Sequence, residues 1–335
     1  YLCHVMMGGS LRSANGGGKV GSKCVTPKGM SVDWVMGNSQ VNFSGYQALR
    51  TPIVKRATDH PVVFADALVQ SDKVATSGIR HVVTINVQGL RGSALNANST
   101  VPIPRIRQLA TSGASTNNAR ILSDASSPLG NAFGIITGRP ATKANGGTSI
   151  GTAQDKGGPV HRSAGAYVSS AFSTISDTGR RTALWSSDRN FYNRAVTSWD
   201  STNGYADRVG VDNGRNKIRA KGYASGDGAV INKVIADLRA HRTAYTSVTL
   251  SSADRIARKY GGESARYRAA IKAIDNHIWR LVKSINGNPA LGRKTVLIIT
   301  SDHGAVKSSY LRGNVASAVR VPFVVWGATV NRGSD

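Results

Sequence analysis

A carboxylate and an imidazole stand next to each other just after one short apolar segment. Residues 296–299 are Val, Leu, Ile and Ile, and Asp302 and His303 follow them. A short apolar run bounded by polar residues is typical of a strand buried on both faces of a parallel sheet. In open α/β sheets the functional crevice lies beyond the carboxyl ends of the strands. An oxygen and a nitrogen ligand there can hold a divalent metal ion such as zinc, although a strand that simply ends in a polar turn has the same pattern.

The segments around this one alternate between strand-like and helix-like patterns. The predicted strands are residues 81–87, 182–186, 246–250 and 320–326, and the predicted helices are residues 101–113, 131–137, 167–178, 228–240 and 264–285. The last helix is the clearest, because its apolar residues recur at helical spacing. Strands that alternate with helices predict an α/β fold with a mostly parallel central sheet and helices on both faces.

The chain divides by pattern into two parts. Residues 1–78 form an N-terminal segment of unassigned role, in which residues 61–69 fit either a strand or a short helix, and residues 79–335 form the α/β domain. Within that domain, residues 187–227 are rich in loop-forming residues. A long irregular segment of this kind is more often a substrate-side insert than a core element. Its aromatic residues are candidates to contact a substrate: Phe191, Tyr192 and Trp199.

The charge of the chain is unusual for a folded protein. Lys and Arg number 43 against 18 Asp and Glu, which gives a formal net charge of +25, and Glu263 is the single glutamate. Such a charge suggests a nucleic-acid or anionic partner. The basic residues are nevertheless scattered, and no nucleic-acid recognition motif is present. Because the acid count is so far from ordinary composition, we hypothesise that some acids are recorded as other residues, which peptide mass mapping would test.

Other features of the sequence bear on the location and the covalent state of the chain. No apolar run approaches the roughly 20 residues of a membrane span, and no signal peptide is recognisable at Tyr1. Cys3 and Cys24 form either one disulfide or two free thiols. The oligomeric state is left open.

Several segments, taken in order, resemble the alkaline phosphatase superfamily, and within it the type I phosphodiesterase/nucleotide pyrophosphatase group. They are HVVTINVQGLR, SSPLGNAFGIITGRP, DRIARKYG, AIDNHIWRLV, TSDHG and VPFVVWG, and together they span about residues 80–330. The resemblance implies a hydrolase of phosphate esters or nucleotides that works through a Ser/Thr phospho-enzyme with two divalent metal ions, usually zinc. By family habit it also implies a secreted or periplasmic protein.

The resemblance places metal ligands at six positions, and three of them keep a ligand residue. Asp254, Asp302 and His303 match directly, whereas the other three positions hold Gln88, Arg258 and Arg312. Arginine cannot ligate zinc because it stays protonated. The side-chain carbonyl of Gln88 can coordinate a metal only weakly.

The nucleophile position is also altered. It aligns without gaps to Pro128, which cannot attack phosphorus, and a shift of one residue places Ser127 there instead. Asn131 matches an asparagine that in this family helps to hold the phosphate oxygens.

Two interpretations follow from the resemblance. One is a metal-dependent hydrolase of phosphate esters. The other is a degenerate pseudoenzyme of the same fold, which binds phosphorylated ligands through positive charge at Arg258 and Arg312. Nucleic-acid binding is a third interpretation, with the least support.

Overall fold

The computed structural model describes residues 12–16, 18–20, 23–25, 35–37, 41–69, 78–122, 127–195, 217–305 and 316–334. The chain forms two compact units, Tyr1–Ser77 and Gly78–Asp335. Cys3, Trp199 and Arg312 lie outside the described residues.

The first unit contains two small antiparallel sheets. One consists of β5 (Val41–Leu49) and β6 (Val62–Val69), with α2 (Pro52–Ala57) between them in the chain. The other is made of β1 (Arg12–Ser13), β2 (Gly18–Val20), β3 (Lys23–Val25) and β4 (Met36–Gly37). Residues 61–69, which the sequence left as strand or helix, are therefore almost entirely strand.

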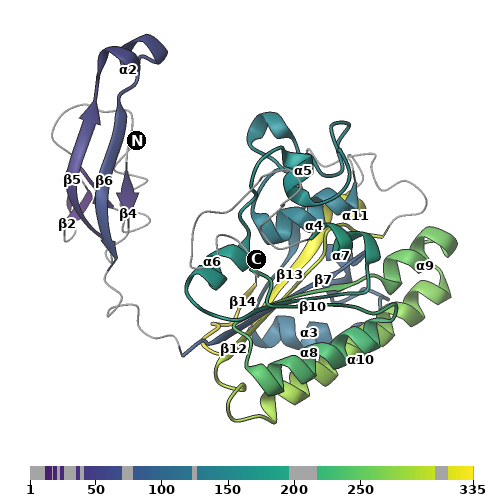
Figure 1. Cartoon of the computed structure of the whole chain (residues 1–335). Coiled ribbons are helices and arrows are strands. Elements are labelled where there is room, and N and C mark those ends of the chain that lie inside the picture. The colour runs from purple at the N-terminus through teal and green to yellow at the C-terminus, as the bar shows by residue number, and fades with distance from the viewer. Residues whose placement is uncertain are drawn as a thin grey trace. The chain divides into compact units, whose positions relative to one another are not determined.

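The second unit is built on an eight-stranded sheet with the order β10-β9-β11-β7-β12-β13-β8-β14 (Figure 1). The strands are β7 (His81–Val87), β8 (Ala114–Arg120), β9 (Thr182–Ser186), β10 (Ala220–Tyr223), β11 (Tyr245–Leu250), β12 (Thr295–Thr300), β13 (Arg320–Gly327) and β14 (Gly333–Ser334). The five strands from β10 to β12 are mutually parallel, and β13 runs antiparallel to both of its neighbours. The prediction of a mostly parallel sheet is confirmed.

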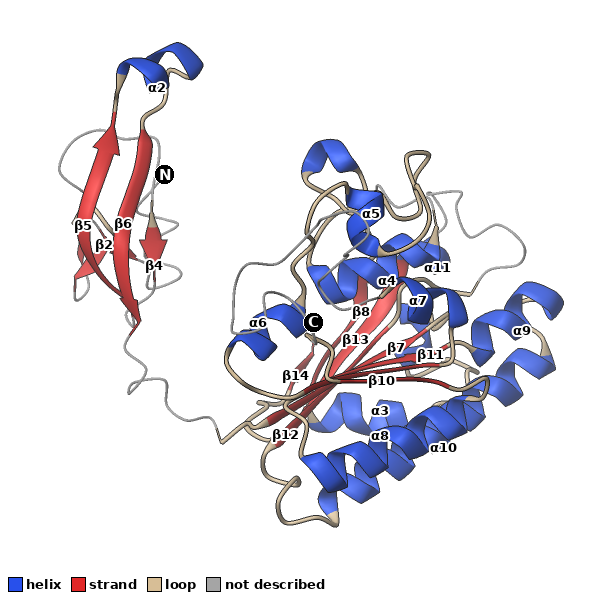
Figure 2. Ribbon diagram, viewed as in Figure 1, coloured by secondary structure: helices blue, strands red, loops and turns tan. Residues whose placement is uncertain are grey.

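Helices cover both faces of this sheet (Figure 2). On one face lie α3 (Pro104–Ser112), α8 (Asp227–His241) and α10 (Ala265–Asn286), whose apolar side chains share one core with β7, β11 and β12. On the other face lie α4 (Pro128–Thr137), α5 (Val160–Ala164), α6 (Ala171–Asp177) and α7 (Arg189–Arg194), with a core of their own. The remaining helical elements are η2 (Gly92–Leu95), η3 (Lys143–Asn145), α9 (Ser252–Tyr260) and α11 (Ala316–Val319).

Most of the predicted elements are present, and the main differences are a shortened helix, the unpredicted strand β8, and the sheet strand β10 within residues 187–227, which the sequence analysis interpreted as an insert. The helix expected at residues 167–178 is shorter, because Ser170 caps it in a capping box with Ser173 and α6 begins only at Ala171. Strand β8 was not predicted, since its sequence ASTNNAR has no apolar alternation. It is a strand because β13 and β14 supply hydrogen-bonding partners on both sides.

Helix α3 receives its N-terminal cap from another helix. Its own N-cap residue, Ile103, offers no side-chain hydrogen bond. Instead, the carboxylate of Asp275 on α10 accepts the backbone N–H groups of Arg105 at 3.1 Å and Ile106 at 2.8 Å. These donors have no partner within the helix, so the contact fixes α3 to α10. Among the described helices, none is long and apolar enough to span a membrane.

Candidate functional site

A cleft of about 660 Å³ opens beyond the carboxyl ends of the parallel strands. Gln88 follows β7, Ser187 and Asp188 follow β9, and Ser251 follows β11. The other lining residues come from α4, α7, α9, the end of β10 and the loop at Asp155. Parallel strands end at the same edge of a sheet, and this is where the sequence predicted the functional crevice.

The imidazole of His303 is held between two carboxylates behind this cleft. Its Nδ1 lies 2.6 Å from Asp302 Oδ1 and its Nε2 lies 2.9 Å from Asp254 Oδ1. All three residues are buried. Burial by itself would lower the pKa of His303, but the two carboxylates outweigh burial and raise it to about 9. The ring is therefore a cation at neutral pH and donates a hydrogen bond from each nitrogen.

Two further side chains extend this arrangement at its ends. Gln88 Nε2 donates to Asp302 Oδ2 at 3.1 Å and to Asp188 Oδ2 at 2.9 Å. At the other end, Arg258 Nε donates to Asp254 Oδ2 at 2.8 Å. We call the six residues Asp188, Gln88, Asp302, His303, Asp254 and Arg258 the polar chain. Burial would raise the pKa of Asp254, yet His303 and Arg258 together hold it below its usual value.

The polar chain bears directly on the two-metal centre that the resemblance implies. Both nitrogens of His303 and both oxygens of Asp254 are engaged by other side chains of the protein. A guanidinium stands at Arg258, and Gln88 presents its amide N–H groups to Asp188 and Asp302. Within the described ranges, no three His, Cys, Asp or Glu side chains are grouped so that they could hold a metal ion. These residues do not fit a centre of two zinc ions.

Ser127 occupies the wall of the cleft at the N-terminus of α4. It is the N-cap residue, its side chain makes no capping hydrogen bond, and Pro128 is the first residue of the helix. Gly151, at φ +73°, packs so closely that an added Cβ would lie 2.1 Å from Ser127 Oγ. A helix N-terminus carries partial positive charge and unpaired N–H groups, which favour an anion. Ser127 therefore presents a hydroxyl where a phosphate group would be stabilised.

Asn131 does not line the cleft. It is buried on α4, and its Oδ1 accepts the backbone N–H of Leu122 at 3.0 Å. Its Nδ2 is buried without a hydrogen-bond partner. In this structure, Asn131 holds the backbone of Leu122, and it borders a neighbouring cavity with Leu122 and Asp302.

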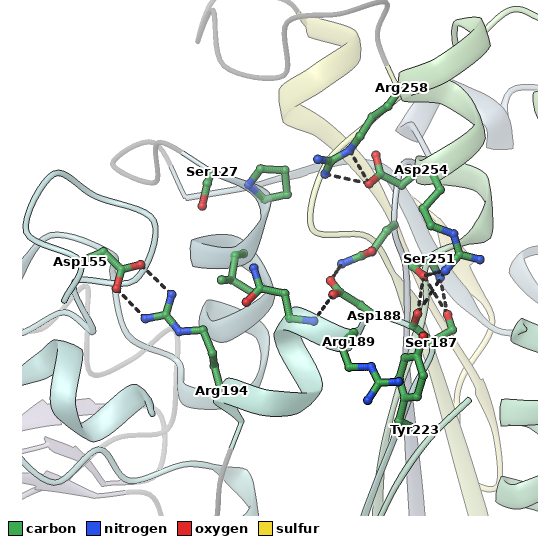
Figure 3. A pocket seen from close by; sticks show the side chains of 15 residues that line it. Ser127, Asp155, Ser187, Asp188, Arg189, Arg194, Tyr223, Ser251, Asp254 and Arg258 are labelled. Atoms are coloured by element: carbon green, nitrogen blue, oxygen red, sulfur yellow. Dashed lines mark hydrogen bonds and ion pairs between the residues drawn. The ribbon is translucent and has the colours of Figure 1, made fainter. Parts of the chain in front are cut away.

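An ion pair between Asp155 and Arg194 forms the other side of the cleft (Figure 3). The guanidinium binds both carboxylate oxygens, at 2.8 and 2.5 Å. Asp155 also accepts the backbone N–H groups of Gly151 and Gly157, each at 2.9 Å. Burial would raise the pKa of Asp155, but Arg194 and these donors hold it far below its usual value. The pair thus fixes the loop that backs Ser127.

Sequence reasoning missed Asp155, Asp188 and Arg194. Asp188 carried a usable signal, because it follows the strand at 182–186 in the same way that Asp302 follows its own strand. Asp155 and Arg194 lie 39 positions apart in loop-rich sequence, and no local pattern joins them.

The aromatic residues of the predicted insert divide into different roles. Phe191 is buried in the second core, with its ring 5.2 Å from that of Phe133, so its prediction as a substrate contact is wrong. Tyr192 packs against Tyr223 at 6.0 Å. The aromatic side chain that lines the cleft is Tyr223, with the Arg189 guanidinium 3.9 Å from its ring centroid.

The sequence model of the family named type I phosphodiesterase / nucleotide pyrophosphatase matches residues 140–317, more than half of the chain. The chain belongs to this family. The resemblance recognised from its motifs is therefore confirmed. No curated protein matches.

Solved structures with a similar fold include three from different branches. A murine ectonucleotide pyrophosphatase/phosphodiesterase 5 matches at 17% identity with a TM-score of 0.49, over 67% of this chain and 57% of the murine one. A sulfatase from a study of glycosaminoglycan metabolism by Bacteroides thetaiotaomicron matches at 12% identity with a TM-score of 0.52, over 77% of this chain and 69% of the sulfatase. A Vibrio parahaemolyticus protein of the alkaline phosphatase superfamily matches at 12% identity with a TM-score of 0.50, over 77% of this chain and 62% of the Vibrio protein. The last two establish an alkaline-phosphatase-like fold. This chain spans little more than half the length of the murine protein.

Proposed function

We propose that this chain hydrolyses a phosphate ester bound in the cleft, with Ser127 as the nucleophile. The observation that carries the proposal is the place of Ser127, which stands at the N-terminus of α4 in the wall of a cleft beyond the parallel strands. Membership of a phosphodiesterase family supports a phosphate ester as the substrate class. A phosphodiester or a nucleotide is the substrate that the family favours.

Charge in the cleft suits a phosphate group. Four guanidinium groups line it, from Arg189, Arg194, Arg255 and Arg258, against the three carboxylates of Asp155, Asp188 and Asp254. Arg194 is paired with Asp155, and Arg258 is paired with Asp254 while its side chain is 53% exposed. Phosphoryl transfer depends mainly on positioning and on stabilising charge at the equatorial oxygens. We assign that role to Arg258 and to the partial positive charge at the N-terminus of α4.

In the proposed reaction, Ser127 Oγ attacks phosphorus in line with the leaving oxygen, and the P–O bond to that oxygen breaks as the leaving alcohol departs with the proton from the serine. Water then attacks phosphorus, returns a proton to Ser127 Oγ and releases a phosphate monoester. The resemblance adds two divalent ions, usually zinc, which would supply charge stabilisation. Because the side chains present do not fit that centre, the proposed reaction includes no metal ion. Secretion or residence in a periplasm stays a proposal from family habit.

A second function is favoured by one observation. Arg258 binds Asp254, and the two nitrogens of His303 bind Asp302 and Asp254. The three metal-ligand residues that match the family, Asp254, Asp302 and His303, are therefore already paired with charged groups of the protein. A protein that binds phosphate esters without turning them over would have such a site. Arg258 would then contact the phosphate directly.

One pair of assays separates the two functions. Turnover of an aryl phosphodiester by the whole chain is compared with that of Ser127→Ala, and binding of a non-hydrolysable phosphonate is measured in parallel. The hydrolase proposal predicts turnover that falls at least about 100-fold in Ser127→Ala, with phosphonate binding retained. The binding function predicts no turnover and a phosphonate affinity that falls in Arg258→Gln. Absence of both turnover and binding would refute both functions. Arg332→Gln, an exposed residue that lines no described pocket, is the matched control.

A further inference from the structure

A second, strongly basic pocket lies at the opposite edge of the same sheet. Its volume is about 400 Å³, and its lining comes from the segments that lead into β7, β9, β11 and β12. The five cationic residues among them are Arg80, Arg180, Arg181, Arg242 and Lys294. Among the described residues, no carboxylate lines this pocket. Because parallel strands all begin at one edge, basic residues that are far apart in the sequence meet here.

Only part of this positive charge is balanced by the protein itself. Arg181 Nη2 lies 3.1 Å from Asp237 Oδ1, so one cation has an acidic partner. The C-termini of α6, α8 and α10 also point to this edge, and each helix end contributes roughly half a negative charge. These contributions leave about two and a half positive charges without compensation. The pocket therefore holds more positive charge than the three helix C-termini need for their own compensation.

The backbone that carries these side chains is well fixed. The N–H groups of Arg80 and His81 both donate to Lys294 O, at 2.7 and 2.9 Å, and the Ala244 N–H donates to Arg181 O at 2.9 Å. Arg242 adopts a left-handed conformation, with φ +49°, and its N–H donates to Leu238 O at 3.0 Å. The backbone that carries the exposed residues Arg80, Arg180, Arg242 and Lys294 is therefore ordered before a ligand binds, so that binding requires no ordering of the backbone.

His81 also lines this pocket. Its Nδ1 lies 2.9 Å from Thr243 O and so donates to that carbonyl. Burial lowers the pKa of His81, hydrogen bonds to the backbone of Thr243 and Arg242 oppose this, and the charges of Lys294 and Arg242 make a smaller lowering contribution. The ring is thus neutral at pH 7, chiefly because it is buried.

We propose that this pocket binds a small anion with two linked phosphate groups, either free pyrophosphate or the diphosphate of a nucleotide. Guanidinium groups bind phosphate oxygens in bidentate fashion. A single phosphate would leave part of the excess charge uncompensated, whereas a diphosphate can meet several of the five cations at once. The pocket is separate from the Ser127 cleft, since the two lie at opposite ends of the same strands. The proposal does not depend on the proposed hydrolytic function.

Calorimetric titration of the whole chain at physiological salt tests this proposal. Pyrophosphate, ADP and adenosine are titrated separately into the wild-type protein and into Arg80→Gln/Lys294→Gln, with Arg332→Gln as control. Pyrophosphate is expected to bind the wild type and the control equally, and at least about tenfold more weakly to the double variant. ADP that binds more tightly than pyrophosphate would identify the nucleotide as the better ligand, and equal or weaker binding of ADP would identify the free anion. Adenosine is expected not to bind this pocket.

Two further variants keep the result unambiguous. Arg180→Gln/Arg242→Asn removes two other cations, and asparagine tolerates the left-handed conformation at position 242. It is expected to weaken binding as the first pair does, with an unchanged melting temperature. Arg258→Gln, in the cleft, is expected to leave this binding event intact. The proposal is overturned if pyrophosphate does not bind, or if its affinity depends on Arg258 and not on either pocket pair.

Discussion

His303 Nε2 lies 2.9 Å from Asp254 Oδ1, and this contact joins the segment after β12 to the first turn of α9. Both side chains are buried, and the same carboxylate accepts Arg258 Nε through its other oxygen. In a two-metal phosphoesterase these positions would face cations. Here the protein supplies the cations itself, as an imidazolium and a guanidinium.

Removing Asp254 is expected to destabilise the fold far more than removing its partner Arg258. Asp254→Ala leaves a buried imidazolium with one carboxylate, at a cost of about 3 kcal/mol in the free energy of unfolding. Arg258→Ala removes a side chain that is 53% exposed and should cost less than about 1 kcal/mol. Urea denaturation of both variants checks the difference. Equal losses in the free energy of unfolding would show that the Asp254–His303 contact does not stabilise the fold.

Zinc is expected not to be a structural component of this site. Elemental analysis of the purified chain should find well below one zinc per chain, and a chelator should leave the melting temperature unchanged. The reason is that His303 and Asp254 already satisfy each other. Two tightly held zinc ions per chain, or a fall of many degrees with chelator, would show that the polar chain rearranges around metal.

The cap of α3 by Asp275 gives a separate stability prediction. Asp275→Ala leaves the N–H groups of Arg105 and Ile106 without an acceptor and should lower the free energy of unfolding by about 1–2 kcal/mol. The matched control is Lys272→Ala, an exposed position on the same helix. A loss in Asp275→Ala no larger than in the control would contradict the capping role.

Lys221 should give the protein a stability that rises in alkali. Burial lowers the pKa of its ammonium group to about 8, from 10.5. Between these two pH values the unfolded chain binds more protons than the folded one, so the free energy of unfolding increases with pH. Below pH 8 both states are protonated, and the burial penalty is fully present. After allowance for solvent screening the effect is about 1 kcal/mol. Lys221→Met should be more stable at pH 7 and lack this rise, which denaturation at pH 7 and pH 10 would reveal.

The sequence predicted the elements that place the cleft, because strands β7, β9, β11 and β12 are continuous apolar or β-branched runs. It also brought together Asp254, Asp302 and His303, through the resemblance of their motifs. It did not predict that His303 would bind carboxylates on both sides, since no local pattern encodes which polar groups meet in three dimensions. Asp188 was missed because it falls in a segment that was interpreted as an insert.

The basic pocket could not be predicted from the sequence for the same reason. Arg80, Arg181 and Lys294 lie far apart in the sequence, and their charge was interpreted as scattered. Only the parallel strand order β9-β11-β7-β12 brings their positions to one edge. Charge that is dispersed along a chain can therefore be concentrated by topology.

The most direct test of the central claim is to locate a phosphoryl group on the protein. The chain is mixed with an aryl phosphodiester, quenched in acid during turnover, and its peptides are mapped by mass spectrometry. The account predicts an adduct on Ser127 in which phosphorus keeps the second ester group of the substrate, and this adduct is absent from Ser127→Ala, whose turnover is lost. Turnover that continues in Ser127→Ala, or a phosphoryl group on a different residue, would contradict it.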